Sequence, residues 1–495
     1  MEANDDIKNT GSRSLAENAA FNIIRVVFTL LFPVIVFPYI SRRLGPSSLG
    51  SVDFAQSVVA YFAMIASMGI PAYGKIICSG ARHSEEKLKK TICELLYLSF
   101  ALEIIAFSAL VISIFAVPEF YRYRVLLMLN SATILVSGIS VEWIFFALER
   151  FSYTAVRAIA IKIASVLLIF AMVHAPDDYI KYTFINVLSV VATAIMDFSL
   201  AHKYIHFYRL SELNIRRHLG PVIAFFASSV AVTINTNTDI VMLNFMKGEQ
   251  ITGLYTFSGR IKSMLVSLMV AWLDAAIPRL SMLYRTGDAV GFRSLLRSVG
   301  LFTFAAGCAA SSFFIVFSEE TVIILGGTEY LPAAGIVTAL MLCMPVLAVN
   351  FILGYGVLLV SEREKQYACT MMITCLVNIA ANFVLIPVLG AEGAALATLA
   401  SEIGNMLLYY RFGKDCLGDA FKECHLLKIA ALSIITGAVC WIGKGLILTT
   451  HPLLQMILFL AVYLTIYLPC ICLISNDARD ILIRAADGVR SRVKL

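Results

Sequence analysis

The chain has 495 residues, of which 59% are hydrophobic and 15% charged, with a mean hydropathy of +0.84 and a formal net charge of +6. Because a soluble domain carries about 25% charged residues, this chain has too few polar side chains to cover a water-facing surface of its size. The composition excludes a soluble globular protein, and the modest positive charge does not indicate a nucleic-acid partner. It predicts an all-α polytopic membrane protein.

A helix that crosses a bilayer needs roughly 20 apolar residues. By that measure the chain contains about fourteen spans joined by short connections. Their predicted ranges are 18–40, 50–74, 91–117, 125–147, 151–174, 180–205, 219–246, 250–278, 295–317, 332–358, 366–388, 391–411, 425–449 and 452–475. The polar first 17 residues lack the basic region and cleavage site of a secretory signal, so the first span is expected to be uncleaved.

Lysine and arginine are unevenly divided between the two sides of these spans. Of the 39, 26 lie in the N-terminus, every second loop and the C-terminal tail, whereas 7 lie in the opposite loops. Because cytoplasmic loops are enriched in positive charge, both termini are predicted to be cytoplasmic. The split also favours an even number of spans.

Two segments 203 residues apart are similar to each other, "LGPSSLGSVDFAQS" (44–57) and "KGEQITGLYTFSGR" (247–260). The offset covers six predicted spans, an even number, so the pattern is that of parallel repeats, with chance similarity as the alternative. The matched pairs are Gly45/Gly248, Gly50/Gly253 and Phe54/Phe257.

Polar residues follow one face of the span at 250–278. At 100° per residue, that face holds Gly253, Thr256, Arg260, Ser263, Ser267 and Asp274. Arg260 is roughly 15 Å into the span, where a cation costs at least about 2.5 kcal/mol and should face water or a partner. Anion binding by Arg260 and a structural ion pair with Asp239 or Asp274 are both open. Lys262 points to the other side, where its stem can snorkel or pack, and is the weaker candidate for the same role.

The first span carries a similar stripe of Asn18, Asn22, Arg25 and Thr29. Arg25 lies only one or two turns inside the membrane, so snorkelling to the interface is the alternative to a role in binding. Arginine is planar and always ionised, and it can grip a phosphate with two donors. Two arginines on polar stripes therefore favour an anionic, phosphate-bearing ligand.

Other intramembrane polar residues form a second group of candidates. Ionisable side chains within spans mark ion pathways or pair with one another. Arg157 and Lys162 can add to a cationic cavity or pair with these acids, and the asparagines Asn378 and Asn382 are expected to bridge helices by hydrogen bonds. The acidic candidates for coupling or gating are Glu103, Glu142, Asp197, Asp239, Asp274 and Glu402.

Motifs for catalysis are not found in the sequence. It contains no Walker A loop, no HExxH, no GxSxG and no soluble nucleotide-binding domain. We therefore expect neither enzymatic activity nor a cofactor or metal. A membrane-embedded polymerase or glycosyltransferase would need a long outer loop or a soluble catalytic domain, and the short predicted loops supply neither.

Several stretches resemble bacterial polysaccharide flippases, the O-antigen and repeat-unit translocases of the multidrug/oligosaccharidyl-lipid/polysaccharide exporter superfamily. The most specific is "LFPVIVFPYISRRLGPSSLGSVDFAQSVVAYFAMIASMGIPAYGKI", near the N-terminus. "VEWIFFALERFSYTAVRAIAIKI" (141–163), "NTDIVMLNFMKGEQITGLYTFSGRI" and "VLIPVLGAEGAALATLASEI" (384–403) resemble later junctions of the same family. The chain has "FALER" where many members carry a Gln-Gly pair before the Glu, a minor departure.

The resemblance implies a multidrug-and-toxin-extrusion-like fold of 14 transmembrane helices, with two pseudo-symmetric six-helix lobes around a central cavity and two extra C-terminal helices. On this basis the expected division is a cytoplasmic segment at 1–17, an N-lobe at 18–208, a C-lobe at 219–412, two helices at 425–475 and a cytoplasmic tail at 476–495. The expected location is a bacterial or archaeal cytoplasmic membrane.

The resemblance also implies a substrate, an oligosaccharide repeat unit on a polyprenyl diphosphate that moves from the cytoplasmic to the outer leaflet. By similarity, Arg25 and Arg260 are the expected diphosphate contacts, with Asn18, Asn22, Ser263 and Lys262 nearby, and Asp239 matches an acidic position of the family. Expected partners are the lipid-linked glycan, the bilayer, and the polysaccharide polymerase with its chain-length machinery. The alternative is a cation-coupled multidrug exporter of the same fold, which would favour an acidic cavity.

Overall fold

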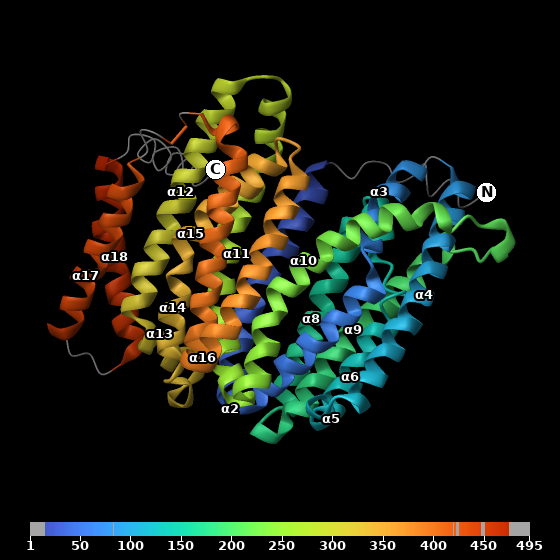
Figure 1. Cartoon of the computed structure of the whole chain (residues 1–495), viewed down its shortest axis with the longest axis horizontal. Coiled ribbons are helices and arrows are strands. Elements are labelled where there is room, and N and C mark those ends of the chain that lie inside the picture. Colours follow the sequence, from blue (N-terminus) through green and yellow to red (C-terminus); the bar gives the residue numbers. More distant parts are fainter. Residues whose placement is uncertain (1–14, 83, 419, 422–424, 447–450, 475–495) are drawn as a thin grey trace. The chain divides into compact units, whose positions relative to one another are not determined.

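The computed structural model describes residues 15–82, 84–418, 420–421, 425–446 and 451–474, with the side chains of 15–33, 151 and 228 outside the description (Figure 1). Throughout these ranges the regular structure is helical, and no strand occurs in them. The expectation of an all-α membrane protein is confirmed. The contacts divide the chain into two compact units, Met1–Val241 and Met242–Leu495. The predicted lobe boundaries stay a prediction.

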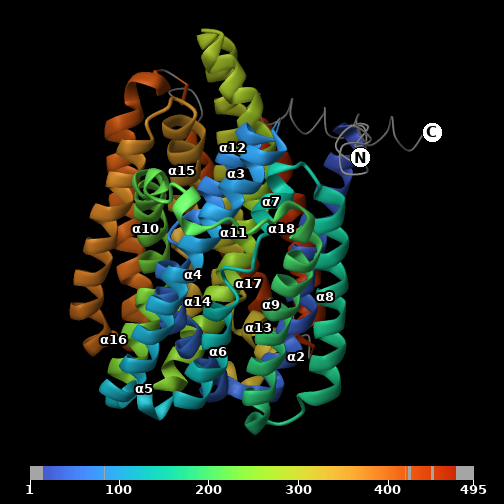
Figure 2. The same ribbon diagram turned by 90° about the vertical axis from the view of Figure 1, so that its right-hand side faces the viewer.

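Unit 1 is built from long helices joined by short turns. Helices α4, α6, α8 and α9 lie side by side, as the two views show (Figures 1 and 2), and apolar clusters fill the spaces between them. Its helices are α2 (Leu15–Ser67), α3 (Ile70–Ala81), α4 (Glu85–Ala116), α5 (Pro118–Arg122), α6 (Arg124–Leu135), α7 (Glu142–Ala147), α8 (Phe151–Met172), α9 (Tyr179–Ala201) and most of α10 (Arg216–Lys247). Short 3-10 turns occupy Pro176–Asp178, His202–Tyr204 and Leu210–Glu212.

Unit 2 contains the rest of the chain. Helices α17 and α18 pack against each other, and their buried side chains join those of α12 in one apolar cluster. Its helices are α11 (Glu249–Arg285), α12 (Ala289–Val316), α13 (Ser318–Gly326), α14 (Ala333–Met341), α15 (Cys343–Phe351), η5 (Ile352–Leu359), α16 (Glu364–Leu417), α17 (Leu426–Leu446) and α18 (Pro452–Ile474), with a 3-10 turn at Thr328–Tyr330.

Eleven helical stretches of the described residues are long and apolar enough to cross a membrane. Two helices are longer than one crossing requires: α2 has 53 residues and α16 has 54. At 1.5 Å per residue each would extend about 80 Å, more than twice a hydrocarbon core of about 30 Å. Both contain a non-helical glycine, Gly45 and Gly390, and each is long enough for two crossings. The predicted total of fourteen is not established by this count.

Gly45 and Gly248, which match each other in the similar segments 44–57 and 247–260, share a backbone conformation. Gly45 has φ 72° and ψ 173°, and Gly248, which precedes α11, has φ 81° and ψ 178°. This combination is essentially restricted to glycine, because a Cβ would collide with the neighbouring peptide. The similarity of the two segments therefore extends from sequence to backbone, which favours a repeat over chance.

Two predicted spans are not the continuous helices that hydropathy suggested. The span at 125–147 divides into α6 and α7, with 136–141 between them, and the span at 332–358 divides into α14, α15 and the π-helix η5. In the first case the Ser137 hydroxyl donates to Glu103 Oε1 at 2.9 Å, and Gly138 packs against the same carboxylate. Polar contacts thus replace helical ones at the break, which hydropathy alone cannot reveal.

Candidate functional site

The polar face of α11 is buried at the start of the helix and becomes accessible further along. Gly253 and Thr256 are buried, Arg260 is half-buried, and Ser263 and Asp274 are exposed. Ser263 donates to the carbonyl of Gly259 at 2.8 Å, so its hydroxyl is satisfied within the helix. The side of α11 that carries Arg260 is therefore not packed into the core of unit 2.

The structure excludes one of the two acids that were considered as ion-pair partners of Arg260, and the pair with Asp239 and the role in anion binding both stay open. Helix α11 runs without a break from Glu249 to Arg285, so Arg260 and Asp274 are separated by about 21 Å along its axis. Two side chains cannot span that distance, and an Arg260–Asp274 ion pair is excluded. Lys262 is half-buried on the same helix. The proposed roles of Arg260, Lys262 and Ser263 stay predictions.

The predicted site in the first span lies outside the described side chains. Helix α2 begins at Leu15, so the backbone at Asn18, Asn22 and Arg25 is helical, as their spacing predicted. Asp239, on α10, is only 6% exposed. Its role also stays a prediction.

Unit 1 contains a buried cluster of charged residues from three helices. Arg157 of α8 bonds to Asp197 of α9 through Nη1, and its Nη2 lies 2.7 Å from Oε1 of Glu142, the first residue of α7. The side chains of Arg157 and Asp197 are 3% and 0% exposed. Of the two possibilities for Arg157, the structure shows pairing with acids, and it brings two of the predicted coupling residues together.

Unit 2 holds a separate polar network around Glu402 of α16. Asn350 of α15 donates through Nδ2 to Oε2 of Glu402 at 2.7 Å, and Asn405 donates to the same oxygen at 3.3 Å. Thr374 donates to Asn405 Oδ1 at 2.7 Å. The carboxylate thus ties α15 to both halves of α16, immediately before the π-helix η5. On the first half of α16, Asn382 donates to Asn378 at 3.0 Å. This bond lies within one helix, so the expected bridging between helices by these asparagines stays a prediction.

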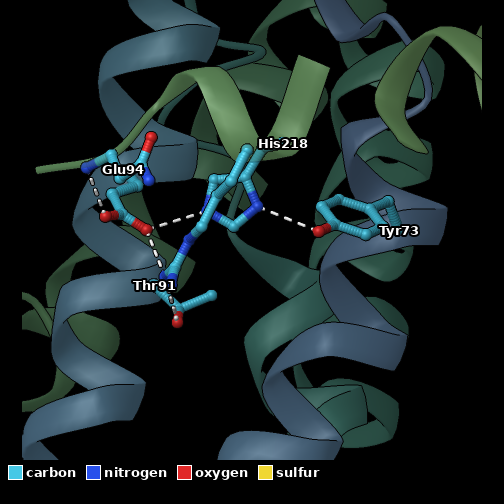
Figure 3. A network of polar contacts seen from close by, with 6 residues as sticks. Tyr73, Thr91, Glu94 and His218 are labelled. Carbon is cyan, nitrogen blue, oxygen red and sulfur yellow. Dashed lines mark hydrogen bonds and ion pairs between the residues drawn. The ribbon is translucent and has the colours of Figure 1, made fainter. Parts of the chain in front are cut away.

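A third network, which the sequence analysis missed, gathers at Glu94 of α4 (Figure 3). Glu94 is fully buried and accepts from Arg217, from His218 Nε2 at 2.8 Å and from the backbone N–H of Asn214 at 2.8 Å. On the other side of the ring, Nδ1 of His218 lies 2.9 Å from the Tyr73 hydroxyl. One carboxylate therefore fixes the start of α10 and the loop before it against α3 and α4.

A signal for this network was present in the sequence. Glu94 falls inside the predicted span at 91–117, and an ionisable residue within a span needs a partner. That partner, His218, is 124 residues away along the chain. Sequence spacing within one helix could not have identified it.

The fold is similar to that of solved transporters, one of which is described as a member of the multidrug/oligosaccharidyl-lipid/polysaccharide exporter superfamily. The lipid II flippase MurJ, in an inward closed conformation, matches with a TM-score of 0.65 at 17% identity, over 91% of this chain and 98% of that one. An inward-facing multidrug transporter of the same superfamily matches with a TM-score of 0.63 at 14% identity, over 81% and 99%. Because both sequence identities are low, these matches establish the fold alone.

Sequence comparison identifies the family of this chain. The family model for polysaccharide biosynthesis proteins matches residues 15–284, more than half of the chain, and the chain belongs to that family. A protein of Escherichia coli (strain K12) described as an O-antigen transporter is 24% identical over 417 residues, which are 82% of this chain and 99% of that protein. A counterpart from Shigella dysenteriae is 22% identical over 375 residues, 75% and 93% of the two chains.

Proposed function

We propose that the protein is a flippase that moves a polyprenyl-diphosphate-linked oligosaccharide from the cytoplasmic to the outer leaflet, by alternating access, for surface polysaccharide assembly. The observation that carries the proposal is the family match, together with similarity to proteins described as O-antigen transporters. A lipid-linked saccharide is also the cargo named for the structural neighbour MurJ, which is described as a lipid II flippase.

Arg260 is the proposed diphosphate contact in unit 2. It sits on the face of α11 that carries Ser263 and is not packed into the core. A guanidinium can donate two parallel hydrogen bonds to phosphate oxygens and stays ionised at all relevant pH values. Arg25, with Asn18 and Asn22, is the proposed contact in the first span, and Lys262 and Ser263 are the proposed neighbours of Arg260. The reaction consists of binding and reorientation, with no covalent step.

The proposed membrane placement follows from the charge of the loops. The excess of lysine and arginine assigns both termini to the cytoplasm of the bacterial cell. The substrate would then be synthesised on the side where it is bound. A polymerase and its chain-length machinery would use the product on the outer side.

The competing function is a cation-coupled multidrug exporter, because such a transporter has a similar fold. A pump for cationic drugs needs an acidic surface at its binding site, since opposite charges attract and like charges repel. The stripe on α11 instead presents an arginine in its middle. Drug-resistance profiling of a deletion strain separates the two functions: unchanged resistance with lost surface glycan supports the flippase.

The direct test of the site compares Arg260→Ala, Arg260→Lys and Arg25→Ala for surface-glycan export at matched membrane levels. We expect both alanine variants to lose export and Arg260→Lys to retain part of it, because lysine keeps the charge without the paired donors. Arg279→Ala is the matched control, since Arg279 is exposed near the end of the same helix. Normal export by all three site variants would contradict the proposed contacts.

A further inference from the structure

The charged cluster of unit 1 contains two carboxylates and one guanidinium. Arg157 bonds to Asp197 on one side and to Glu142 on the other. With both acids ionised, the cluster has a net charge of −1 in an environment where charge is costly. One proton would make it neutral. The charge count alone therefore predicts an affinity for a proton.

Three polar atoms in this cluster are buried without a hydrogen-bond partner: Asp197 Oδ2, Arg157 Nε and the Tyr153 hydroxyl. Buried polar groups are almost always paired. Tyr153 comes from α8, and its ring lies 5.6 Å from the Arg157 guanidinium carbon. Lys75 of α3 lies over the ring of Phe146 in α7, 4.5 Å from its centroid. The cluster thus has unused donors and acceptors in a buried setting.

The two acids differ in accessibility. The Asp197 side chain is fully buried, whereas that of Glu142 is 36% exposed. Glu142 is therefore the carboxylate that can exchange a proton with water. Once it is neutral, Arg157 still has Asp197 as its ionised partner. Protonation then weakens only the ion pair between α8 and α7 and leaves the one between α8 and α9.

Glu142 occupies a position from which this change can move a helix. It is the first residue of α7, which has only six residues and follows the non-helical segment 136–141. Within that segment, the Ser137 hydroxyl donates to Glu103 Oε1. A short helix behind a break can shift without unfolding a whole span. In many transporters, discontinuous helices form the sites for substrate and coupling ion.

We propose that Glu142, Arg157 and Asp197 form the binding site for a coupling proton. This inference rests on the proposed flippase function. A proton from water adds to a Glu142 carboxylate oxygen, and the Glu142–Arg157 ion pair between α7 and α8 is lost, while the packing of Phe145 on Tyr153 remains. When the proton leaves to water, the ion pair re-forms. Arg157 and Asp197 act as positioning residues that set the proton affinity of Glu142.

The adjacent Trp143 allows proton binding to be tested apart from transport. Trp143 is 5% exposed and contacts Gly74 of α3. The chain has three tryptophans, so Trp272→Phe with Trp441→Phe leaves Trp143 as the sole emitter. Its fluorescence is recorded in the purified full-length protein across roughly pH 4 to 9, a range that brackets ordinary and raised carboxyl titrations.

We expect a sigmoidal change of Trp143 emission that Glu142→Gln abolishes, with the emission of this variant fixed at the acid-side value. Asp197→Asn should give an emission titration that differs from that of the parent, because the cluster is then neutral with Glu142 still ionised. Glu149→Gln is the control, since Glu149 pairs with Arg82 at the surface, and it should titrate like the parent. A Glu142→Gln variant that titrates like the parent would overturn the proposal.

Transport supplies the second measurement. In proteoliposomes with a pH gradient, Glu142→Gln should lose the dependence of lipid-linked oligosaccharide movement on the gradient, while the Glu149→Gln control keeps it. If Trp143 titrates through Glu142 but no lipid-linked oligosaccharide is moved, the proposed function is wrong and the proton site stands. If the parent moves the substrate independently of the gradient, the coupling role is wrong.

Discussion

Removing the Glu94 carboxylate tests how much of unit 1 depends on the network in Figure 3. In Glu94→Ala, the Arg217 side chain is left 43% exposed and can turn to water. The His218 ring is 1% exposed and loses its acceptor, as does the backbone N–H of Asn214. Two unsatisfied donors at about 1–3 kcal/mol each give a loss of roughly 2–6 kcal/mol. Breaking a buried ion pair costs about 3–5 kcal/mol, in the same range.

The assay is thermal unfolding of the purified protein in detergent. At roughly 2–4 °C per kcal/mol for a unit of this size, a loss of about 3 kcal/mol lowers the melting temperature by about 6–12 °C. Glu85→Ala is the matched control on the same helix, because Glu85 makes only a surface pair with Lys89 at 2.7 Å. It should melt with the parent protein. Equal melting temperatures for Glu94→Ala and Glu85→Ala would refute the reasoning.

Two further predictions concern glycines. Gly248→Ala should destabilise unit 2 by about 1–3 kcal/mol through backbone strain alone, because the added Cβ has open space around it. Gly259 lies in the interior of α11, and a Cβ there also has open space. Gly259→Ala should therefore stabilise the unit by about 0.5–1 kcal/mol. Melting shifts of the same sign would contradict this. In unit 1, Gly138→Ala places a Cβ 2.5 Å from Glu103 Oε1 and should lower the melting temperature. Adding Glu103→Ala to this variant should restore part of the loss, because it makes room for the Cβ. No recovery in the double variant would argue against the contact.

Hydropathy predicted most of the helices, because spans must be apolar and of nearly constant length. Gly45 and Gly248 were identified in the sequence only as a matched pair, whereas the backbone conformation that they share came from the structure. The break between α6 and α7 was not predicted. It depends on Glu103, which belongs to a different helix, and its segment 136–141 is apolar enough to continue a span.

The contacts between polar residues of different helices were also not predictable from the sequence. Glu142, Arg157 and Asp197 could each be identified as intramembrane charges, but pairing with acids and lining a cationic cavity were equally consistent with the sequence. Only the packing of α7, α8 and α9 brings them together. Glu94 and His218 form their contact across 124 residues, and helical periodicity carries no information over that separation.

The central claim is that an arginine on α11 recognises a diphosphate on a lipid-linked glycan. The most direct measurement is movement of a polyprenyl-diphosphate-linked oligosaccharide across proteoliposomes that contain either the parent protein or Arg260→Ala, with Arg279→Ala as the control. We expect the parent and the control to move it and Arg260→Ala to be strongly impaired. Equal rates for all three would contradict the account, as would transport of the same oligosaccharide on a polyprenyl alcohol as fast as on the diphosphate.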